Sequence, residues 1–200
     1  MRDFKWYAPN WHKANEAAWR IYLGHLKDQP NVRALEIGSL EGRSAIWLLD
    51  NILTHETSSL VMVDPWVEEV VPITDTTDLA GKHDWYSRCL YNMEQSGHAG
   101  RYTMIRSKSI PQLAQWMATE ERLNFIYVDG SHIGADALCD IVMCWRLLKP
   151  GGILIADDYG IKPAKPAPTP KHAVDAFLTC MPNTTVLHKG YQVILRKEPT

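Results

Sequence analysis

The sequence has few cysteines, and they follow no metal-binding pattern. The four cysteines, Cys89, Cys139, Cys144 and Cys180, are far apart and form no C-x-x-C motif. Structural zinc sites and the disulfide frameworks of small secreted proteins need closely spaced or numerous cysteines. We therefore expect free thiols rather than a zinc site or a disulfide-bonded scaffold.

Basic residues are not in excess either. The chain has 21 lysines and arginines against 23 aspartates and glutamates, which gives a formal net charge of -2. Binding to a phosphate backbone without regard to sequence needs a clustered basic surface. The balanced charge therefore predicts that nucleic acid is not a partner.

Long hydrophobic runs are also missing. No apolar stretch approaches the roughly 20 residues that a membrane-spanning helix needs, and residues 1–10 lack the apolar core of a signal peptide. We expect a soluble, cytoplasmic protein that has no membrane partner. Its 200 residues, of which 46% are hydrophobic, suffice for one domain, 1–200, with one substantial core.

What the sequence does contain is a regular alternation of short apolar runs and amphipathic stretches. Parallel strands need crossover connections, and helices must cover both faces of such a sheet. The pattern predicts an α/β fold that is Rossmann-like, with a mainly parallel seven-stranded sheet, helices on both faces and a C-terminal antiparallel hairpin. The expected strands are 32–37, 59–63, 101–106, 124–129, 151–157, 184–188 and 191–195, and the expected helices are 10–27, 43–53, 84–95, 110–118, 135–148 and 171–180.

Three segments lie outside this alternation. Residues 1–30 are expected to form an N-terminal helical extension, in which Asn10 caps the first helix. Residues 66–83 mix acids with threonines, and residues 159–170 are rich in proline, so both are predicted to be loops. Open α/β sheets bind ligands at the carboxyl ends of their strands. We therefore predict two substrate-side loops, with a contribution to the substrate pocket from Phe4, Trp6 and Tyr7.

A glycine-bearing turn follows the first expected strand, in the sequence E-I-G-S-L-E-G-R-S of residues 36–44. Glycine lets the backbone approach a ligand closely at the start of a helix. A dinucleotide fingerprint would need glycine in place of Leu40 and Arg43, and a phosphate loop would need lysine at Arg43. The turn is therefore typical of neither a nicotinamide enzyme nor a nucleoside triphosphate-binding protein.

The E-x-G-x-x-x-G pattern of this turn resembles the first motif of class I S-adenosylmethionine-dependent methyltransferases. Asp64 ends the second strand, where a carboxylate can accept both ribose hydroxyls of a nucleoside. The resemblance implies S-adenosylmethionine as the cofactor, with its methionine part beside Gly38 and its adenine near Ser107. The cofactor-binding residues that it implies are Glu36, Gly38, Ser39, Gly42, Ser44, Asp64, Ser107, Lys108 and Asp129.

Three carboxylates end two strands that are expected to be neighbours. Asp129 follows one strand, and Asp157 and Asp158 follow the other. Unpaired carboxylates at one edge of a sheet would repel each other, and a cation would remove that repulsion. Several hard oxygen ligands suit magnesium, with calcium or manganese as other candidates. We therefore predict a divalent metal site, most simply magnesium, at Asp129, Asp157 and Asp158.

Further motifs resemble the small catechol-type and macrolide-sugar-type O-methyltransferases. They are F-I-Y-V-D-G-S-H at 125–132, L-L-K-P-G-G-I-L-I-A-D-D-Y at 147–159 and K-H-A-V-D-A-F-L at 171–178. The resemblance implies that His132, in a D-x-x-H spacing with Asp129, is the general base, and both are candidate catalytic residues. The alternative is that Ser131 and His132 only cap the helix that follows. Catechol-type enzymes have Asp-Asn where this chain has two aspartates.

The leading hypothesis is thus metal-assisted O-methylation of a hydroxyl on a small molecule of natural-product, sugar or phenolic type. A homo-oligomer is compatible with the sequence. Two alternatives remain open: a metal-independent N- or carboxyl-methyltransferase, and a hydroxylase-like or cofactor-binding protein on the same fold.

Overall fold

The computed structural model describes residues 2–67, 84–119 and 122–199. Seven strands form one sheet in the order β3-β2-β1-β4-β5-β7-β6. The pairs from β3 through β5 are parallel, whereas β7 is antiparallel to both β5 and β6. This confirms the predicted mainly parallel sheet with a C-terminal antiparallel hairpin. The strands are β1 Arg33–Ile37, β2 Ser59–Asp64, β3 Tyr102–Arg106, β4 Leu123–Val128, β5 Leu148–Ala156, β6 Thr184–Lys189 and β7 Val193–Lys197.

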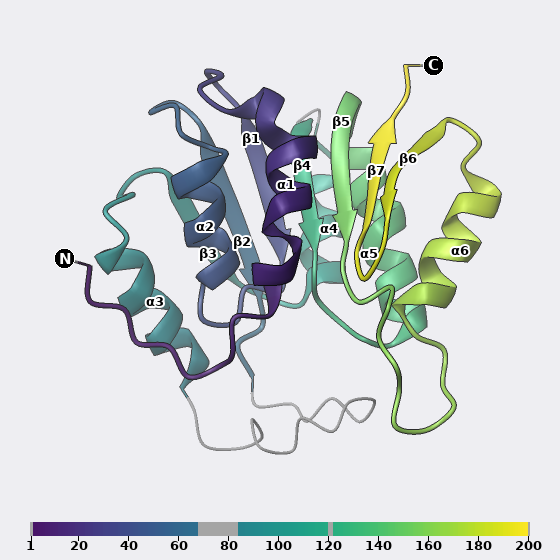
Figure 1. Cartoon of the computed structure of the whole chain (residues 1–200), viewed down its shortest axis with the longest axis horizontal. Helices are drawn as coiled ribbons and strands as arrows, with labels where there is room; N and C mark the ends of the chain where they lie inside the picture. The colour runs from purple at the N-terminus through teal and green to yellow at the C-terminus, as the bar shows by residue number, and fades with distance from the viewer. Residues whose placement is uncertain (1, 68–83, 120–121, 200) are drawn as a thin grey trace.

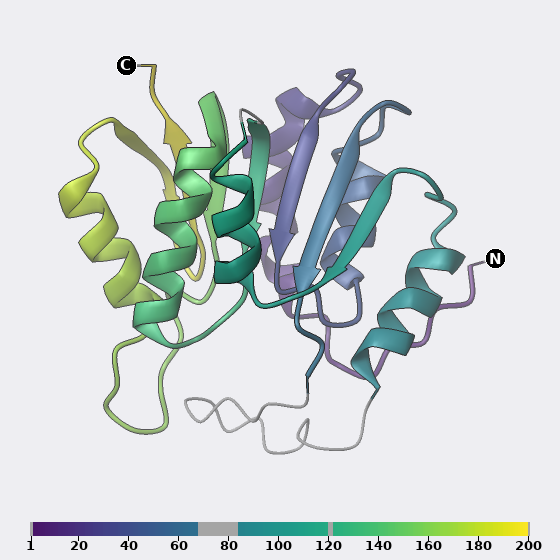
Figure 2. The same ribbon diagram turned by 180° about the vertical axis from the view of Figure 1, so that it is seen from behind.

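Helices cover both faces of this sheet, as predicted (Figures 1 and 2). On one face, Trp19, Leu48 and Cys89 of three helices pack against strand residues in a first buried cluster. On the other face, a second cluster includes Ile141 and Phe177. The helices are α1 Glu16–Leu23, α2 Arg43–Asn51 and α3 Trp85–Gln95 on the first face, and α4 Ser109–Trp116, α5 Gly134–Leu147 and α6 Pro170–Cys180 on the second.

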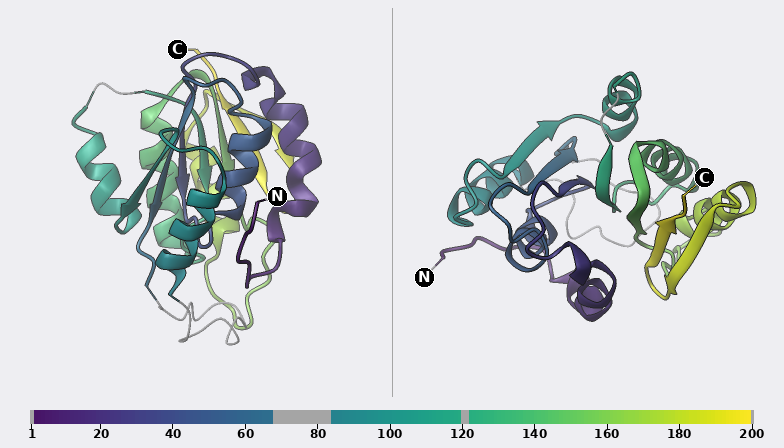
Figure 3. Two further views of the ribbon diagram at one scale, coloured as in Figure 1. Left: turned by 90° about the vertical axis from the view of Figure 1, so that its left-hand side faces the viewer. Right: turned by 90° about the horizontal axis from the view of Figure 1, so that it is seen from above.

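The strand order reverses direction between β1 and β4, which lie side by side at the middle of the sheet. Chain connections leave these two strands toward opposite faces, and open α/β sheets bind ligands at the carboxyl ends of such strands. The view from above in Figure 3 shows the sheet between its two helical layers. The fold therefore places the turn after β1 and the residues after β4 and β5 at one edge.

The N-terminal segment differs from its prediction. Residues 2–9 are extended, and we call them the N-terminal strap. The expected helix 10–27 is in fact a 3₁₀ helix, Trp11–Asn15, followed by α1 and a second 3₁₀ turn, Gly24–Leu26. Asn10 makes no capping hydrogen bond through its side chain. Gly24, whose backbone freedom disfavours a helix interior, is the residue at which α1 ends. The prediction of one continuous helix over 10–27 was wrong.

Two boundaries on the hairpin side also differ. Strand β5 begins at Leu148, immediately after α5, because Leu148 already pairs with Leu123 of β4. The glycine-containing segment 149–152 of β5 forms an irregularity before the pairing resumes at Phe125 and Ile153. Strand β7 begins at Val193, so Tyr191 and Gln192, which we expected in a strand, lie in the turn after β6. The Gly190 amide donates to the Gln192 carbonyl oxygen at 2.9 Å across that turn. Within the described residues, no helix has the length and apolar character needed to span a membrane.

Candidate active site

The turn after β1 is shaped by two glycines with left-handed backbone angles. Gly38 has a φ of 85° and Gly42 a φ of 78°. A Cβ atom on Gly38 would lie 1.8 Å from the carbonyl oxygen of Asp129, which no side chain tolerates. Gly38 is therefore required where the turn after β1 meets the residue after β4, and this contact brings the predicted cofactor loop to the predicted acidic site.

Glu36 is buried against this loop and does not face solvent. It is fully buried, and its two carboxylate oxygens accept hydrogen bonds from the hydroxyls of Ser39, at 2.6 Å, and Ser44, at 2.5 Å. Burial raises its pKa from 4.5 to about 7, although the two serine hydrogen bonds lower it. Glu36 thus holds both ends of the loop in place.

Asp64, at the end of β2, fixes the same loop from its other side. Its Oδ2 atom accepts hydrogen bonds from the backbone amides of Ser39, at 2.8 Å, and Leu40, at 3.0 Å. Its Oδ1 atom accepts from the amide of Trp66 at 2.6 Å. Burial raises the pKa of Asp64, while these amide hydrogen bonds oppose the rise. The predicted ribose-binding acid is therefore also the residue that organises the loop.

The predicted adenine neighbours lie beside this acid. The backbone amide of Ser107 donates to the carbonyl oxygen of Asp64 at 3.1 Å. Lys108 follows as the N-cap residue of α4 and is exposed. The structure therefore brings Ser107 and Lys108 to the carboxyl end of β2, on the side of Asp64 that faces β3.

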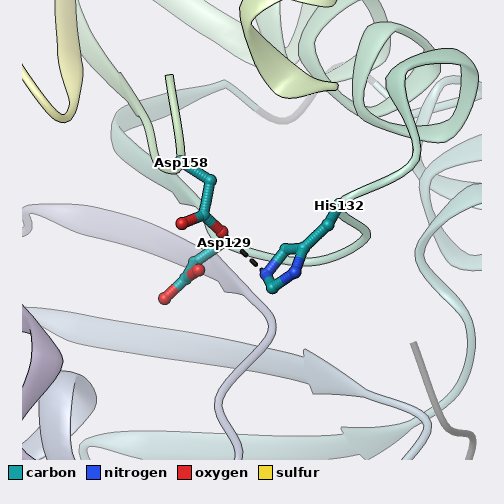
Figure 4. Close-up of side chains that lie close together, drawn as sticks. All are labelled: Asp129, His132 and Asp158. Atoms are coloured by element: carbon teal, nitrogen blue, oxygen red, sulfur yellow. Dashed lines mark ion pairs between the residues drawn. The ribbon is translucent and has the colours of Figure 1, made fainter. Parts of the chain in front are cut away.

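Three side chains converge after β4 and β5 at the same edge of the sheet. Asp129, His132 and Asp158 each offer one potential ligand atom, and these atoms all lie within 4.8 Å of one another. His132 Nε2 is 2.7 Å from Asp158 Oδ2, as Figure 4 shows. The side chain of His132 thus points into the site. The alternative role as a helix cap does not apply to it, because α5 has Ile133 as its N-cap residue and no side-chain cap.

Asp157, which we predicted as a metal ligand, lies outside this group of three. Its Oδ2 atom accepts hydrogen bonds from the Tyr127 hydroxyl and from Gln192 Nε2, the latter at 2.9 Å. Its Oδ1 atom accepts from the backbone amide of Asp158 at 2.7 Å. Sequence spacing treats neighbouring aspartates alike, but the turn directs their side chains differently. His132 takes the third place in the group.

The electrostatics of this site reflect unneutralised negative charge. Burial, together with the nearby Asp157 and Asp158, raises the pKa of Asp129 well above its ordinary value. Burial and Asp158 likewise raise the pKa of Asp157. Burial lowers the pKa of His132, but its hydrogen bond to Asp158 and the carboxylate charges outweigh this and raise it. The site therefore favours positive charge, either as a proton or as a cation.

Three residues of the site were missed from the sequence. The Tyr127 hydroxyl lies 2.9 Å from Asp129 Oδ2 and also contacts Asp157. Tyr191 donates to Asp158 Oδ1 at 2.8 Å. Gln192, 1% exposed, binds Asp157 as described. The one available signal was a glutamine within the apolar run 191–195, because a polar side chain in a buried strand needs a partner.

The predicted substrate-side segments are only partly described. Residues 159–170 connect β5 to α6 at the edge of the sheet that carries the acidic site (Figure 1). Most of the other loop, residues 68–83, lies outside the described residues. Phe4 and Trp6 of the N-terminal strap pack against the first core cluster. Tyr7 is 47% exposed, and its amide donates to Glu41 of the cofactor loop at 2.7 Å.

Residues 35–159 match the model of a protein family described as a methyltransferase domain. This match covers more than half of the chain. It includes the glycine turn and the three aspartates Asp129, Asp157 and Asp158. The chain belongs to this methyltransferase family. No curated protein matches the sequence.

Solved structures of methyltransferases share the fold. An O-methyltransferase from Bacillus cereus in complex with SAH has a TM-score of 0.65 at 15% identity, covering 98% of this chain and 84% of that one. The O-methyltransferase TomG from Streptomyces achromogenes, involved in tomaymycin synthesis and solved with SAM, has a TM-score of 0.65 at 16% identity, covering 100% and 84%. An rRNA methylase from Streptococcus thermophilus has a TM-score of 0.60 at 11% identity, covering 96% and 100%. The class I methyltransferase fold is therefore shown, and it hosts more than one kind of substrate.

Proposed function

We propose that this methyltransferase transfers a methyl group from S-adenosylmethionine to a hydroxyl of a small molecule, with the help of a divalent cation. The observation that carries the proposal is the meeting of two sites at one edge. The glycine turn contacts Asp129 directly, and Asp129 belongs to the group with His132 and Asp158. A methyl donor in the turn would thus lie beside the residues that prepare the acceptor.

The residues of the turn suit a nucleoside cofactor. Gly38 and Gly42 keep the backbone free of side chains, and Asp64 stands at the end of β2 with a carboxylate held by amides. A carboxylate in this place can accept hydrogen bonds from ribose hydroxyls. The O-methyltransferases from Bacillus cereus and Streptomyces achromogenes were solved with SAH and SAM respectively, which supports the same cofactor class here.

The acidic site fits a hard divalent cation. Ligands of one ion lie about 2.0 to 2.6 Å from it, so two of them are separated by no more than about 5 Å. The donor atoms of Asp129 and Asp158 meet this limit. Magnesium commonly uses one or two carboxylates, with water and substrate oxygens in its other positions. We assign Asp129 and Asp158 as ligands, and a bound cation would supply charge neutralisation and a more acidic acceptor hydroxyl.

His132 is the proposed general base. Its Nε2 atom faces Asp158, which leaves Nδ1 as the nitrogen that would take up the proton, and the imidazole comes from the loop between β4 and α5 that borders the site. An imidazole takes up a proton near neutral pH, which suits removal of the proton from the acceptor hydroxyl. Asp158 holds the ring in position and stabilises the imidazolium that forms. A hydroxylated natural product, sugar or phenol is the substrate class that this chemistry serves.

The decisive experiment is calorimetric titration of the protein with S-adenosylmethionine and S-adenosylhomocysteine, with magnesium and after chelation. We expect micromolar binding of both cofactors and a separate binding event for magnesium. Screening of hydroxylated acceptors should then yield S-adenosylhomocysteine only when the cation is present. No cofactor binding would overturn the proposal, and turnover that survives chelation would instead favour a metal-independent N- or carboxyl-methyltransferase.

A further inference from the structure

A buried chain of hydrogen bonds runs from the N-terminal helix to the acidic site. Trp19 of α1 is 0% exposed, and its Nε1–H donates to Gln192 Oε1 at 2.7 Å. Gln192 Nε2 in turn donates to Asp157 Oδ2 at 2.9 Å and lies 3.3 Å from the Tyr127 hydroxyl. Trp19 also packs edge-on against the Tyr127 ring, with 4.9 Å between centroids. Residues that lie 173 positions apart in the sequence are thereby joined.

Trp19 and Asp157 together determine which way the glutamine amide points. The indole N–H is a donor only, so the Gln192 atom that faces it must be the carbonyl oxygen. The amide nitrogen is then directed to Asp157, whose carboxylate is an acceptor when ionised. Without the indole N–H, the amide loses one of the partners that hold it, and its hydrogen bond to Asp157 is less firmly fixed. A tryptophan outside the acidic site therefore helps to hold the donor that Asp157 receives.

Asp157 in turn supports an unusual backbone conformation. Asp158 has a φ of 57°, in the left-handed region that residues with a side chain rarely adopt. Its amide is held by Asp157 Oδ1 at 2.7 Å, and in this conformation of the turn its carboxylate contacts His132 and Tyr191. Such strain persists when surrounding contacts over-determine it.

We propose that Trp19 and Gln192 are positioning residues, which act through Asp157 to hold the backbone turn at Asp158 and thereby aim its carboxylate at His132. Neither residue belongs to the group of potential ligands formed by Asp129, His132 and Asp158. The effect on the turn is a property of the folded chain alone, whereas the consequence for cation binding rests on the proposed function. This arrangement makes α1, which precedes the matched family domain, part of the machinery of the site.

The test measures amide hydrogen exchange of Asp158 by NMR in Trp19→Phe and Gln192→Met. Trp19→Phe keeps an aromatic ring but removes the N–H donor, and Gln192→Met keeps the length of the side chain without its amide. We expect exchange at Asp158 to become about tenfold faster in both variants, because one supporting hydrogen bond is lost. The matched control is Trp145→Phe, which makes the same change in the second core cluster, where Trp145 packs against Phe177.

Unchanged exchange at Asp158 in Trp19→Phe would overturn the proposal, as would an equal acceleration along all of β5, which would indicate general loosening. Trp19→Phe alone decides the matter if Gln192→Met does not fold. Titration with Mn²⁺ provides a second measurement: affinity should fall about tenfold in Trp19→Phe and stay unchanged in Trp145→Phe. Absence of Mn²⁺ binding by the unaltered protein would count against the metal part of the proposed function, while the exchange measurement would still decide the role of Trp19.

Discussion

The cofactor turn and the acidic site meet at one edge of the sheet, yet they are built in opposite ways. In the turn, the carboxylates of Glu36 and Asp64 are each satisfied by donors from the loop that they hold. At the acidic site, potential ligand atoms of Asp129 and Asp158 lie within 4.8 Å of each other, and His132 contacts Asp158. The turn is thus complete as it stands, whereas the acidic site has negative charge that a cation can neutralise.

This difference indicates that the acidic site, rather than the cofactor turn, carries the chemistry. A loop whose polar groups are already paired provides shape and fixed hydrogen bonds, and it binds a ligand without much rearrangement. Buried carboxylates that approach one another repel, and such an arrangement is typical of sites that serve binding or catalysis. Substitutions in the two halves should therefore separate cofactor affinity from turnover.

The largest effect is expected from Asp129→Asn and Asp158→Asn. Each substitution removes a proposed cation ligand while it preserves side-chain size, so turnover should fall by about 1,000-fold or more. The affinity for S-adenosylhomocysteine should change by less than about threefold, because the turn keeps its own hydrogen bonds. Steady-state kinetics and calorimetry measure the two quantities. Normal turnover in both variants would refute the metal assignment.

A smaller effect, on cofactor affinity rather than on turnover, is expected from Asp64→Ala. The variant loses the acceptor for three backbone amides, from Ser39, Leu40 and Trp66, and the proposed partner of the ribose. Cofactor affinity should fall about 10- to 100-fold, whereas Mn²⁺ affinity should not change. Asp50→Ala is the control. Asp50 lies on α2, away from the site, and its carboxylate pairs with Arg2 and His98. Equal losses of both affinities would erase the distinction between the two halves.

The smallest effect is expected from Glu36→Gln, and it concerns how stability depends on pH. The pKa of Glu36 is raised from 4.5 to about 7, so the folded state keeps a proton that the unfolded chain has lost between these values. The contribution of Glu36 to stability is present below the lower value and is lost as pH rises through the higher one. In the unaltered protein, the free energy of unfolding should therefore fall between about pH 5 and about pH 7. Glu36→Gln should make this fall smaller by on the order of 2 kcal/mol.

Chemical denaturation at several pH values measures this change, and Glu16→Gln is a suitable comparison. Glu16 begins α1 at the surface and lies 3.6 Å from His12, outside the turn. An identical pH dependence of stability in Glu36→Gln and in the unaltered protein would show that Glu36 is ionised in the folded state.

The sequence predicted the elements of the fold with boundaries that are mostly correct to within one or two residues, because amphipathic periodicity and glycine turns are local signals. It also predicted Gly38, Asp64 and Asp129 at one edge, since parallel strands have their carboxyl ends together. It did not predict the divided roles of Asp157 and Asp158. Adjacent residues differ in direction through backbone angles, and the φ of 57° at Asp158 leaves no mark in residue type.

Tyr127 and Gln192 illustrate a second limit of prediction from sequence, which concerns contacts between distant segments. Tyr127 lies in the apolar run of β4, where an aromatic residue ordinarily fills core volume, and Gln192 was assigned to a strand. Their partner Asp157 is 30 residues from Tyr127 and 35 from Gln192, so no spacing rule connects them. Only when β7 pairs with β5 do these side chains meet.

The sequence by itself therefore determined the α/β architecture, the glycine turn and the acids at the strand ends, because each depends on residues that are close together in the chain. The tertiary structure decided which carboxylates face one another, which histidine nitrogen faces Asp158, and how Trp19 reaches the site through Gln192. Those choices depend on donors and acceptors brought together from distant segments. A buried polar group takes the partner that packing provides, and packing is a property of the whole fold.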